Sequence, residues 1–121
     1  IERELGGRYD VTHGAGLAVI LPAWMKYIYK RNVNRFAQFA SRIWNVDIYF
    51  ENLESTALEG ILRMTDFFRR LGLPTTLKEL NVHEDQLEEI ASRCTGNGTK
   101  TVGNCSKLNY DDVFHILQLA R

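Results

Sequence analysis

The chain has 121 residues, of which 45% are hydrophobic and 25% charged, the ordinary mixture of a globular protein with a single core. Its 15 basic and 15 acidic residues leave a formal net charge of zero, so the basic excess of a nucleic-acid-binding protein is missing. No uninterrupted apolar stretch reaches the ~18 residues that a membrane span needs. We therefore expect one domain over residues 1–121, with no nucleic-acid and no membrane partner.

The first residues have the character of a helix that begins upstream. The chain opens with IEREL, with no methionine and no apolar leader segment before it. We therefore expect a fragment of a longer cytoplasmic protein, and a fragment can carry only part of a functional site.

Residues 9–27, YDVTHGAGLAVILPAWMKY, place a histidine in front of the most hydrophobic segment of the chain. From residue 17 onward apolar side chains occupy nearly every face, which predicts a buried helix. A glycine inside a helix costs about 1 kcal/mol relative to alanine. Gly14 and Gly16, which directly follow His13, therefore indicate that another group must approach the backbone closely here.

Helical spacing continues to the end of the chain. Pro22 is expected to kink or restart the first long helix, and a clean apolar stripe follows it: Val33, Phe36, Ala37, Ala40, Ile43 and Trp44. The longest predicted helix covers about residues 51–71, with one face formed by Leu58, Ile61, Leu62, Thr65 and Phe68. Two shorter stripes come last: Leu87, Ile90, Ala91 and Cys94, then Val113, Ile116, Leu117 and Ala120.

Local signals mark the ends of these helices. Thr76 and Glu79 are spaced as a capping box, and Asn109 stands as the N-cap of the last helix. The only strand-like window is VDIYFE at residues 46–51, and it is short. The sequence therefore predicts an all-α helical bundle with short connections.

Two cysteines, Cys94 and Cys105, flank a glycine-rich loop. In a secreted protein this pattern would indicate a disulfide. Since nothing in the sequence indicates export, we expect both thiols to be reduced, with Cys94 in a helix core and Cys105 in a loop.

Of the three histidines, His83 and His115 lie among acidic residues and are expected on the surface. His13 has two interpretations. It can pack as a core or capping histidine, or it can bind a metal, because the positive end of a helix dipole disfavours a protonated imidazole and leaves a neutral one. In the second case Asp10 would orient the other ring nitrogen, and the two glycines would leave room for a substrate or cofactor ring. A metal site needs three or four ligands, so residues outside this chain would have to complete it.

The segment LGGRYDVTHGAGLAVILPAWMKY resembles the second signature of the iron-containing alcohol dehydrogenases, particularly the butanol-dehydrogenase-like branch that uses NADH or NADPH. VNRFAQFASRIWNV, FFRRLGLPTTLKEL and LNYDDVFHILQLA are similar to that branch in order and spacing, so the resemblance covers essentially the whole chain. It implies the all-α, dehydroquinate-synthase-like C-terminal metal-binding domain of a two-domain enzyme. The N-terminal domain, which binds the dinucleotide, would be a partner outside this chain.

The resemblance also assigns roles to residues. One aspartate and three histidines of the family bind a divalent metal, iron or zinc, between the two domains, and the last histidine matches His13. The histidine before it would lie just upstream of Ile1. Arg3 stands where many members carry a further histidine, so this position cannot supply a ligand or carry a proton. Trp24 is expected in the core rather than in a substrate pocket.

The function implied is an oxidoreductase that interconverts a primary, butanol-like alcohol and its aldehyde with NADH or NADPH. The full-length enzyme would be cytoplasmic and a homodimer, whereas the fragment alone would be inactive. Two alternatives stay open at this point. One is a small helical interaction module without catalysis, in which His13 only packs. The other is a related enzyme of the glycerol dehydrogenase type.

Overall fold

Helices make up most of the chain that the computed structural model describes, which is residues 1–8, 12–99, 101–103 and 107–121, without the side chains of residues 2, 3 and 8. The α-helices of this part are α1 (Glu2–Arg8), α2 (His13–Ile28), α3 (Val33–Trp44), α4 (Leu53–Arg70), α5 (Leu87–Cys94) and α6 (Tyr110–Leu119). Its short 3-10 helices are η1 (Tyr29–Asn32), η2 (Lys78–Leu80) and η3 (Glu84–Gln86). Extended pairing in the described part is limited to one isolated bridge between Val102 and Leu108. The predicted all-α class is confirmed.

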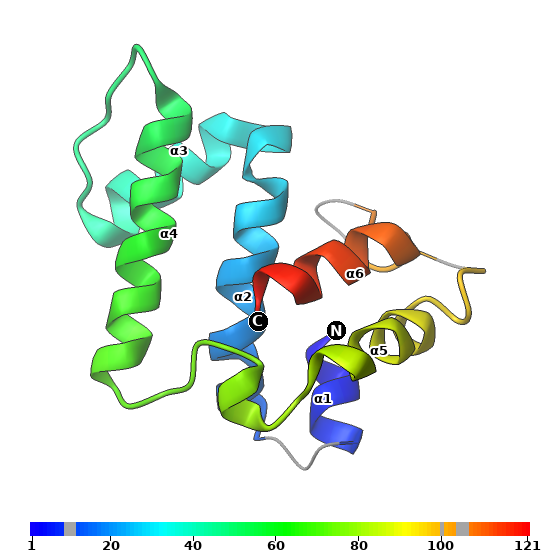
Figure 1. Cartoon of the computed structure of the whole chain (residues 1–121). Coiled ribbons are helices and arrows are strands. Elements are labelled where there is room, and N and C mark those ends of the chain that lie inside the picture. The colour runs from blue at the N-terminus through cyan, green and yellow to red at the C-terminus, as the bar shows by residue number, and fades with distance from the viewer. Residues whose placement is uncertain (9–11, 100, 104–106) are drawn as a thin grey trace.

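Helix α2 runs through the middle of the fold and contacts α1, α4 and α6 (Figure 1). Thr12 caps its start, because the threonine hydroxyl accepts a hydrogen bond from the Ala15 N–H at 3.3 Å. The helix then continues unbroken through Pro22 to Ile28. The expected restart at Pro22 was therefore wrong. Proline removes only one N–H from the helix, and the buried residues on both sides of it hold α2 together.

Helices α3 and α4 pack against each other, and α4 also contacts α2 (Figure 1). Their contact is made by small residues: a Cβ added to Gly60 would clash with the Ala40 methyl group and lie 2.7 Å from the Ala40 Cα. The buried face of α4 therefore differs in part from the apolar face predicted from the sequence. Its buried residues are Thr56, Ala57, Gly60, Ile61, Met64 and Thr65.

Part of the predicted burial of α3 and α4 was therefore wrong. Leu62 is 45% exposed and Ile43 is 65% exposed, whereas both were assigned to buried stripes. Leu58 and Phe68 are only partly buried. The prediction assigned the faces with the largest apolar side chains to the core. The two helices instead meet where small side chains let their backbones approach each other.

The Gly60 contact predicts a stability defect. Gly60→Ala would raise helix propensity, yet its methyl group has no space against Ala40, and overpacking of this kind costs about 1–3 kcal/mol. Gly7→Ala is the matched control, because a Cβ at Gly7 meets no atom of the described chain within 4 Å. We expect chemical denaturation of the full-length protein to show a loss for Gly60→Ala and none for Gly7→Ala. Equal stability of the two variants would contradict the close α3–α4 contact.

Helices α5 and α6 follow the sequence prediction closely. Each residue of the stripe predicted in α5 is buried: Leu87, Ile90, Ala91 and Cys94. In α6 the Asn109 side chain accepts a hydrogen bond from the Asp112 N–H at 2.9 Å, and the Asp112 carboxylate accepts one from the Asn109 N–H at 2.9 Å. The start of α6 was thus predictable from short-range capping signals. The Glu79 N–H donates to the Thr76 hydroxyl at 3.3 Å, as the spacing predicted, but the residue that directly precedes η2 is Leu77, so Thr76 is not the N-cap of that helix.

The Cys94 thiol is free and lies in the core. Burial raises the pKa of this thiol, so little thiolate is present at neutral pH. We therefore expect Cys94 to react slowly with thiol reagents. Cys105 lies outside the described residues, and its reduced state stays a prediction.

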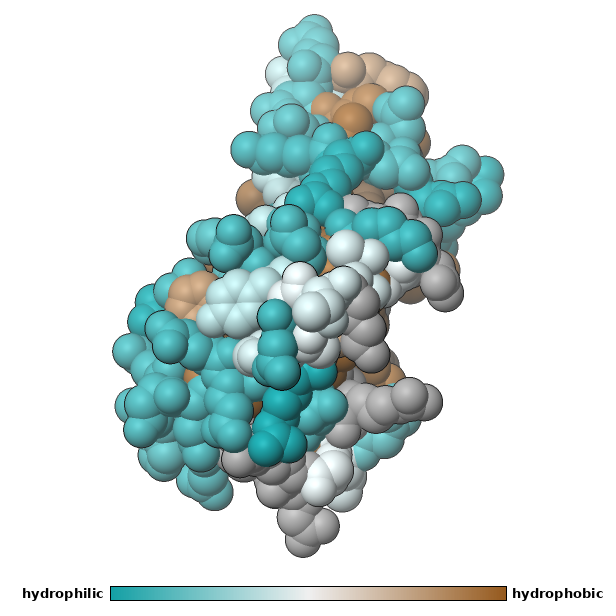
Figure 2. Space-filling view, turned by 90° about the vertical axis from the view of Figure 1, so that its right-hand side faces the viewer, coloured by the Kyte–Doolittle hydropathy of each residue, from teal (hydrophilic) through white to brown (hydrophobic). Residues whose placement is uncertain are grey.

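The surface is largely hydrophilic in the view of Figure 2, and hydrophobic residues emerge mainly at its upper end. The loop between α3 and α4 reaches the same end of the molecule (Figure 1). Phe50 in this loop is 82% exposed, and the strand-like window around it forms no strand. Among the described residues, no helix combines the length and hydrophobicity required to traverse a bilayer.

Candidate functional site

His13 is the first residue of α2, directly after the Thr12 cap, and it is exposed. The two glycines that follow His13 lie in different surroundings. Gly14 is exposed, and a Cβ added to it would meet no atom of the described chain within 4 Å. Gly16 is buried on the inner side of the helix. The start of α2 therefore presents an imidazole and, beside it at Gly14, a stretch of backbone that no side chain of the described residues covers.

The described part of the chain supplies one candidate donor at this place. It contains no group of three or more histidine, cysteine, aspartate or glutamate side chains arranged to hold a metal ion. Asp10 and the side chain of Arg3 lie outside the described residues, so their expected roles stay predictions. An exposed imidazole at a capped helix start could serve as one ligand of a metal, but the described residues supply no others beside it.

An apolar pocket of about 340 Å³ runs along α2 beyond His13. Its lining residues are Ile1, Leu17, Ile20, Leu21, Trp24, Val102, Gly103 and Leu108. Ile20 and Leu108 are buried at its base, whereas Leu17 is 37% exposed. Trp24 packs edge to face against Phe36, with ring centroids 6.2 Å apart, and is only partly buried. It therefore belongs both to the edge of the core and to the pocket wall, which refines its expected place in the core.

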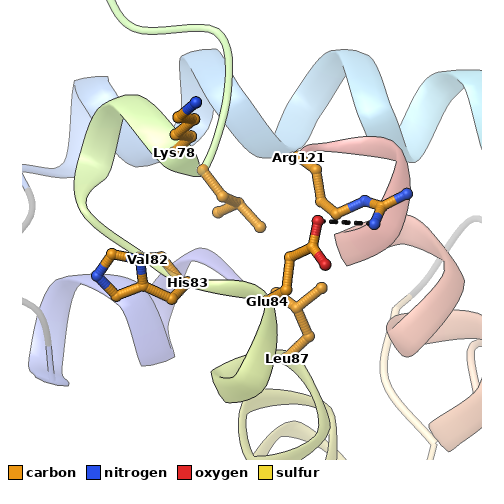
Figure 3. Close-up of a pocket in the computed structure, with 7 residues that line it drawn as sticks. Lys78, Val82, His83, Glu84, Leu87 and Arg121 are labelled. Carbon is orange, nitrogen blue, oxygen red and sulfur yellow. Dashed lines mark hydrogen bonds and ion pairs between the residues drawn. The ribbon is translucent and has the colours of Figure 1, made fainter.

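A larger pocket of about 560 Å³ lies between η2, η3 and the end of α6 (Figure 3). Its apolar lining comes from Leu77, Val82 and Leu87, and its charged and polar lining comes from Lys78, His83, Glu84 and Arg121. The Arg121 guanidinium donates to the Glu84 carboxylate at 2.8 Å, so these two charges compensate each other. The pocket contains none of the residues that the sequence singled out for chemistry.

A polar cluster that sequence reasoning missed joins α2 and η1 to α6. The Tyr27 hydroxyl donates to the Asp112 carboxylate at 2.6 Å, and the Arg31 guanidinium donates to the same carboxylate at 3.2 Å. The His115 ring stacks on Tyr27 with centroids 6.2 Å apart, and His115 is exposed as predicted. The partners are 85 residues apart, and the only local signal was the place of Asp112 in the first turn of a helix.

The cluster changes the acidity of both of its central groups. The hydrogen bond to Asp112, together with burial, raises the pKa of the Tyr27 phenol. Burial alone would raise the pKa of Asp112. Hydrogen bonds from Tyr27 and from the Asn109 N–H, with the Arg31 charge, outweigh this and hold it below its usual value. The hydrogen bonds of this polar cluster are therefore strongest when Tyr27 is protonated and Asp112 is ionised.

Comparison with known proteins bears on the whole chain. Residues 1–121 match the C-terminal part of the Fe-containing alcohol dehydrogenase family. The chain belongs to this family. NADH-dependent butanol dehydrogenase A of Clostridium acetobutylicum is 34% identical to it over 119 residues. The probable NADH-dependent butanol dehydrogenase 1 of Bacillus subtilis is 36% identical over 118 residues. These relatives of the iron-containing alcohol dehydrogenase family are matched over 98% of this chain but only 30% of their own length.

A solved relative supports the fold. The crystal structure of NADH-dependent butanol dehydrogenase A from Thermotoga maritima aligns with a TM-score of 0.84 and 32% identity, over 98% of this chain and 31% of that one. The predicted fold of an iron-containing alcohol dehydrogenase C-terminal domain is thus confirmed. The membership agrees with the resemblance found in the sequence and not with a stand-alone interaction module.

Proposed function

We propose that the full-length protein interconverts a primary, butanol-like alcohol and its aldehyde with NADH or NADPH, and that His13 is one ligand of its divalent metal, iron or zinc. The observation that carries this proposal is the match to the C-terminal part of the iron-containing alcohol dehydrogenase family over all 121 residues. The position of His13 at an exposed, capped helix start supports it. The rest of the chain would bind the dinucleotide and supply the other ligands. A cytoplasmic, homodimeric enzyme is part of the same proposal.

The residues of this chain would position the reacting groups. Thr12 fixes the first turn of α2, and the buried body of the helix fixes its direction, so His13 is held at a defined place. Gly14 leaves the neighbouring backbone open for the substrate or the nicotinamide. The role predicted for Gly16 stays a prediction, and its burial turns the space it leaves toward α2's own core contacts. When bound, the metal supplies Lewis-acid activation of the alcohol or aldehyde oxygen.

Metal removal tests the proposal directly. We expect the purified full-length protein to oxidise NADH or NADPH when butanal is added, because hydride passes from the reduced nicotinamide to the aldehyde carbon. Dialysis against a chelator should abolish this oxidation, and Fe²⁺ or Zn²⁺ should restore it. Activity that persists in metal-free protein would contradict the role of the metal. No turnover of any primary alcohol or aldehyde by the metal-loaded protein would contradict the proposed reaction.

A further inference from the structure

We propose that Asn97 is a site of spontaneous covalent modification, at which its side-chain amide is lost as ammonia through a cyclic imide formed with the backbone nitrogen of Gly98. These two residues form the only asparagine–glycine pair in the 121 residues. Both are exposed in the turn at residues 95–99, directly after α5. The modification concerns this turn alone and does not require the reaction proposed above.

Two other asparagines share the backbone conformation of Asn97 and serve as internal references. The left-handed asparagines of the described chain have φ values of 59°, 62° and 61°, at Asn45, Asn81 and Asn97. All three are exposed. The first two are followed by buried valines, Val46 and Val82, whereas Gly98 is exposed and has no side chain. A branched side chain hinders attack by the backbone nitrogen of its own residue, so conversion should concentrate at position 97.

The turn has the conformational freedom that ring closure needs. The backbone nitrogen of Gly98 must rotate toward the side-chain carbonyl carbon of Asn97. Glycines flank this asparagine, and Gly96 and Gly98 have φ values of 54° and 83°, a region that glycine enters and leaves without steric penalty. A Cβ added to Gly98 would meet no atom of the described chain within 4 Å, so its nitrogen is approachable. The rotation breaks a long hydrogen bond, from the Gly98 N–H to the Thr95 hydroxyl at 3.3 Å.

The side chain of Ser92 is placed to activate the amide of Asn97. Its hydroxyl donates to the side-chain oxygen of Asn97 at 2.7 Å. When the Gly98 nitrogen attacks the side-chain carbon, this oxygen gains negative charge, and a donor already aimed at it stabilises the developing charge. Ser92 lies on α5 and is half-buried, so the donor belongs to a helix and not to the turn that rotates. The fold thus adds an activating donor to a pair that is reactive in itself.

The reaction balances without an oxidant or a cofactor. The Gly98 nitrogen forms a bond to the side-chain carbon of Asn97 and gives up its proton, the bond from that carbon to the amide nitrogen breaks, and ammonia leaves with the proton. Water then opens the imide at one of its two carbonyl carbons and returns a proton to the Gly98 nitrogen. Opening at the side-chain carbon gives aspartate at position 97, and opening at the main-chain carbon gives isoaspartate. Because the nitrogen must lose its proton before it attacks, the rate should rise with pH.

Both products would weaken the C-terminal end of α5. Each carries a carboxylate, which the negative end of the helix dipole disfavours. Isoaspartate also lengthens the main chain by one methylene next to the bond from the Asn97 N–H to the Ser92 carbonyl, which is 2.7 Å long. Cys94 and Thr95, just before the turn, are buried. We therefore expect converted protein to react faster with thiol reagents at Cys94 than unconverted protein does.

The test incubates the full-length protein at mildly acidic and at mildly alkaline pH and follows each asparagine by peptide mapping. Mass spectrometry detects the exchange of an NH2 for an OH group, and chromatography separates the aspartate and isoaspartate peptides. The unmodified protein is compared with its Ser92→Ala variant. Thr99→Ala is the matched control, because the Thr99 hydroxyl donates to the Gly96 carbonyl and not to Asn97.

A second pair of variants tests the attacking residue. Gly98→Ala adds a methyl group beside the nitrogen that attacks. Gly72→Ala is its matched control, because Gly72 also has a positive φ, 80°, and open space around an added Cβ, but follows no asparagine. General effects of alanine in a left-handed position are therefore common to both variants.

In the unmodified protein we expect position 97 to convert at least about 10-fold faster than Asn45 or Asn81, because glycine leaves its nitrogen open. Gly98→Ala should remove this difference, and Gly72→Ala should keep it. Ser92→Ala should slow conversion about 5-fold in the folded protein, the effect of one hydrogen bond, whereas Thr99→Ala should not. In denatured protein the Ser92→Ala variant and the unmodified protein should convert at the same rate.

The proposal fails if position 97 converts no faster than Asn45 and Asn81, and this result is also expected if the rest of the full-length chain covers the turn. Conversion in folded Ser92→Ala that is as fast as in the unmodified protein, or faster, would refute the activating role of the serine. If Gly98→Ala does not fold, the comparison of the three asparagines within the unmodified protein decides, because it needs no variant.

Discussion

His13→Ala in the full-length protein is expected to reduce metal occupancy and aldehyde reduction by at least 10–100-fold, the loss typical of removing even an outer partner of a metal ligand. Alanine is a better helix former than histidine, the cap of α2 joins Thr12 to Ala15, and His13 is not among the buried residues of the helix. The variant should therefore stay folded and still bind the dinucleotide. Metal analysis, turnover and melting temperature of the two proteins test this expectation.

The isolated 121-residue chain provides a second measurement of the same idea. Because the described residues contain no cluster of three metal donors, the chain alone should bind no stoichiometric iron or zinc. Full metal occupancy and unchanged turnover in His13→Ala would show that the histidine only packs, and the site assignment would then be wrong.

Asp112→Ala is expected to lower the free energy of unfolding by about 2–3 kcal/mol, because it leaves the Tyr27 hydroxyl, the Arg31 guanidinium and the Asn109 N–H without their shared acceptor. Asp111→Ala, the adjacent exposed acid, is the matched control and should change stability by less than about 0.5 kcal/mol. Chemical denaturation of the full-length variants at neutral pH measures both. Equal losses would show that the cluster contributes nothing beyond general charge.

The same carboxylate gives this prediction a pH signature. The pKa of folded Asp112 is lowered, so its stabilising contribution is complete above its unfolded pKa, near 4, and disappears as the pH falls through the folded value. The stability difference between the unmodified protein and Asp112→Ala should therefore be largest at neutral pH and shrink in acid. The pKa of folded Tyr27 is raised, so its stabilising contribution is complete below its unfolded pKa, near 10, and is lost as the pH rises through the folded value. The polar cluster therefore also weakens above about pH 10. A difference that is constant from pH 3 to pH 7 would contradict the assignment.

Sequence reasoning predicted the helices better than the faces by which they pack. The cap of α6 and the stripe of α5 follow from short-range patterns, because the residues involved are one helical turn apart. The α3–α4 contact was missed because Gly60 carries no hydrophobic signal, although its lack of a side chain is what brings the helices together. Spacing rules weigh side chains and do not register such a position.

The candidate site was predictable only where its residues are neighbours in sequence. His13 and Gly14 could be identified because a histidine and two glycines stand directly before the most hydrophobic segment of the chain, whereas the Thr12 cap was found only in the structure. The pocket walls come from α2 and from residues more than 75 positions later, such as Val102 and Leu108, and no local pattern joins them. Further ligands of the proposed metal site could not be sought in the sequence, because this chain spans only 30% of the length of the relatives it matches.

Helix α2 is attached to α6 near one end, through Tyr27, and carries His13 at the other end, so a small tilt of the helix moves His13 by a larger distance. Tyr27 is held by Asp112 near one end of α2, and His13 lies 14 residues away at the other, a distance of about 21 Å along the axis. A tilt of about 3° around the Tyr27 end would displace the imidazole by about 1 Å, several times the ~0.2 Å tolerance of a metal–ligand distance. Remote substitutions that loosen this hinge point, without touching the site, should therefore weaken metal binding before they unfold the protein.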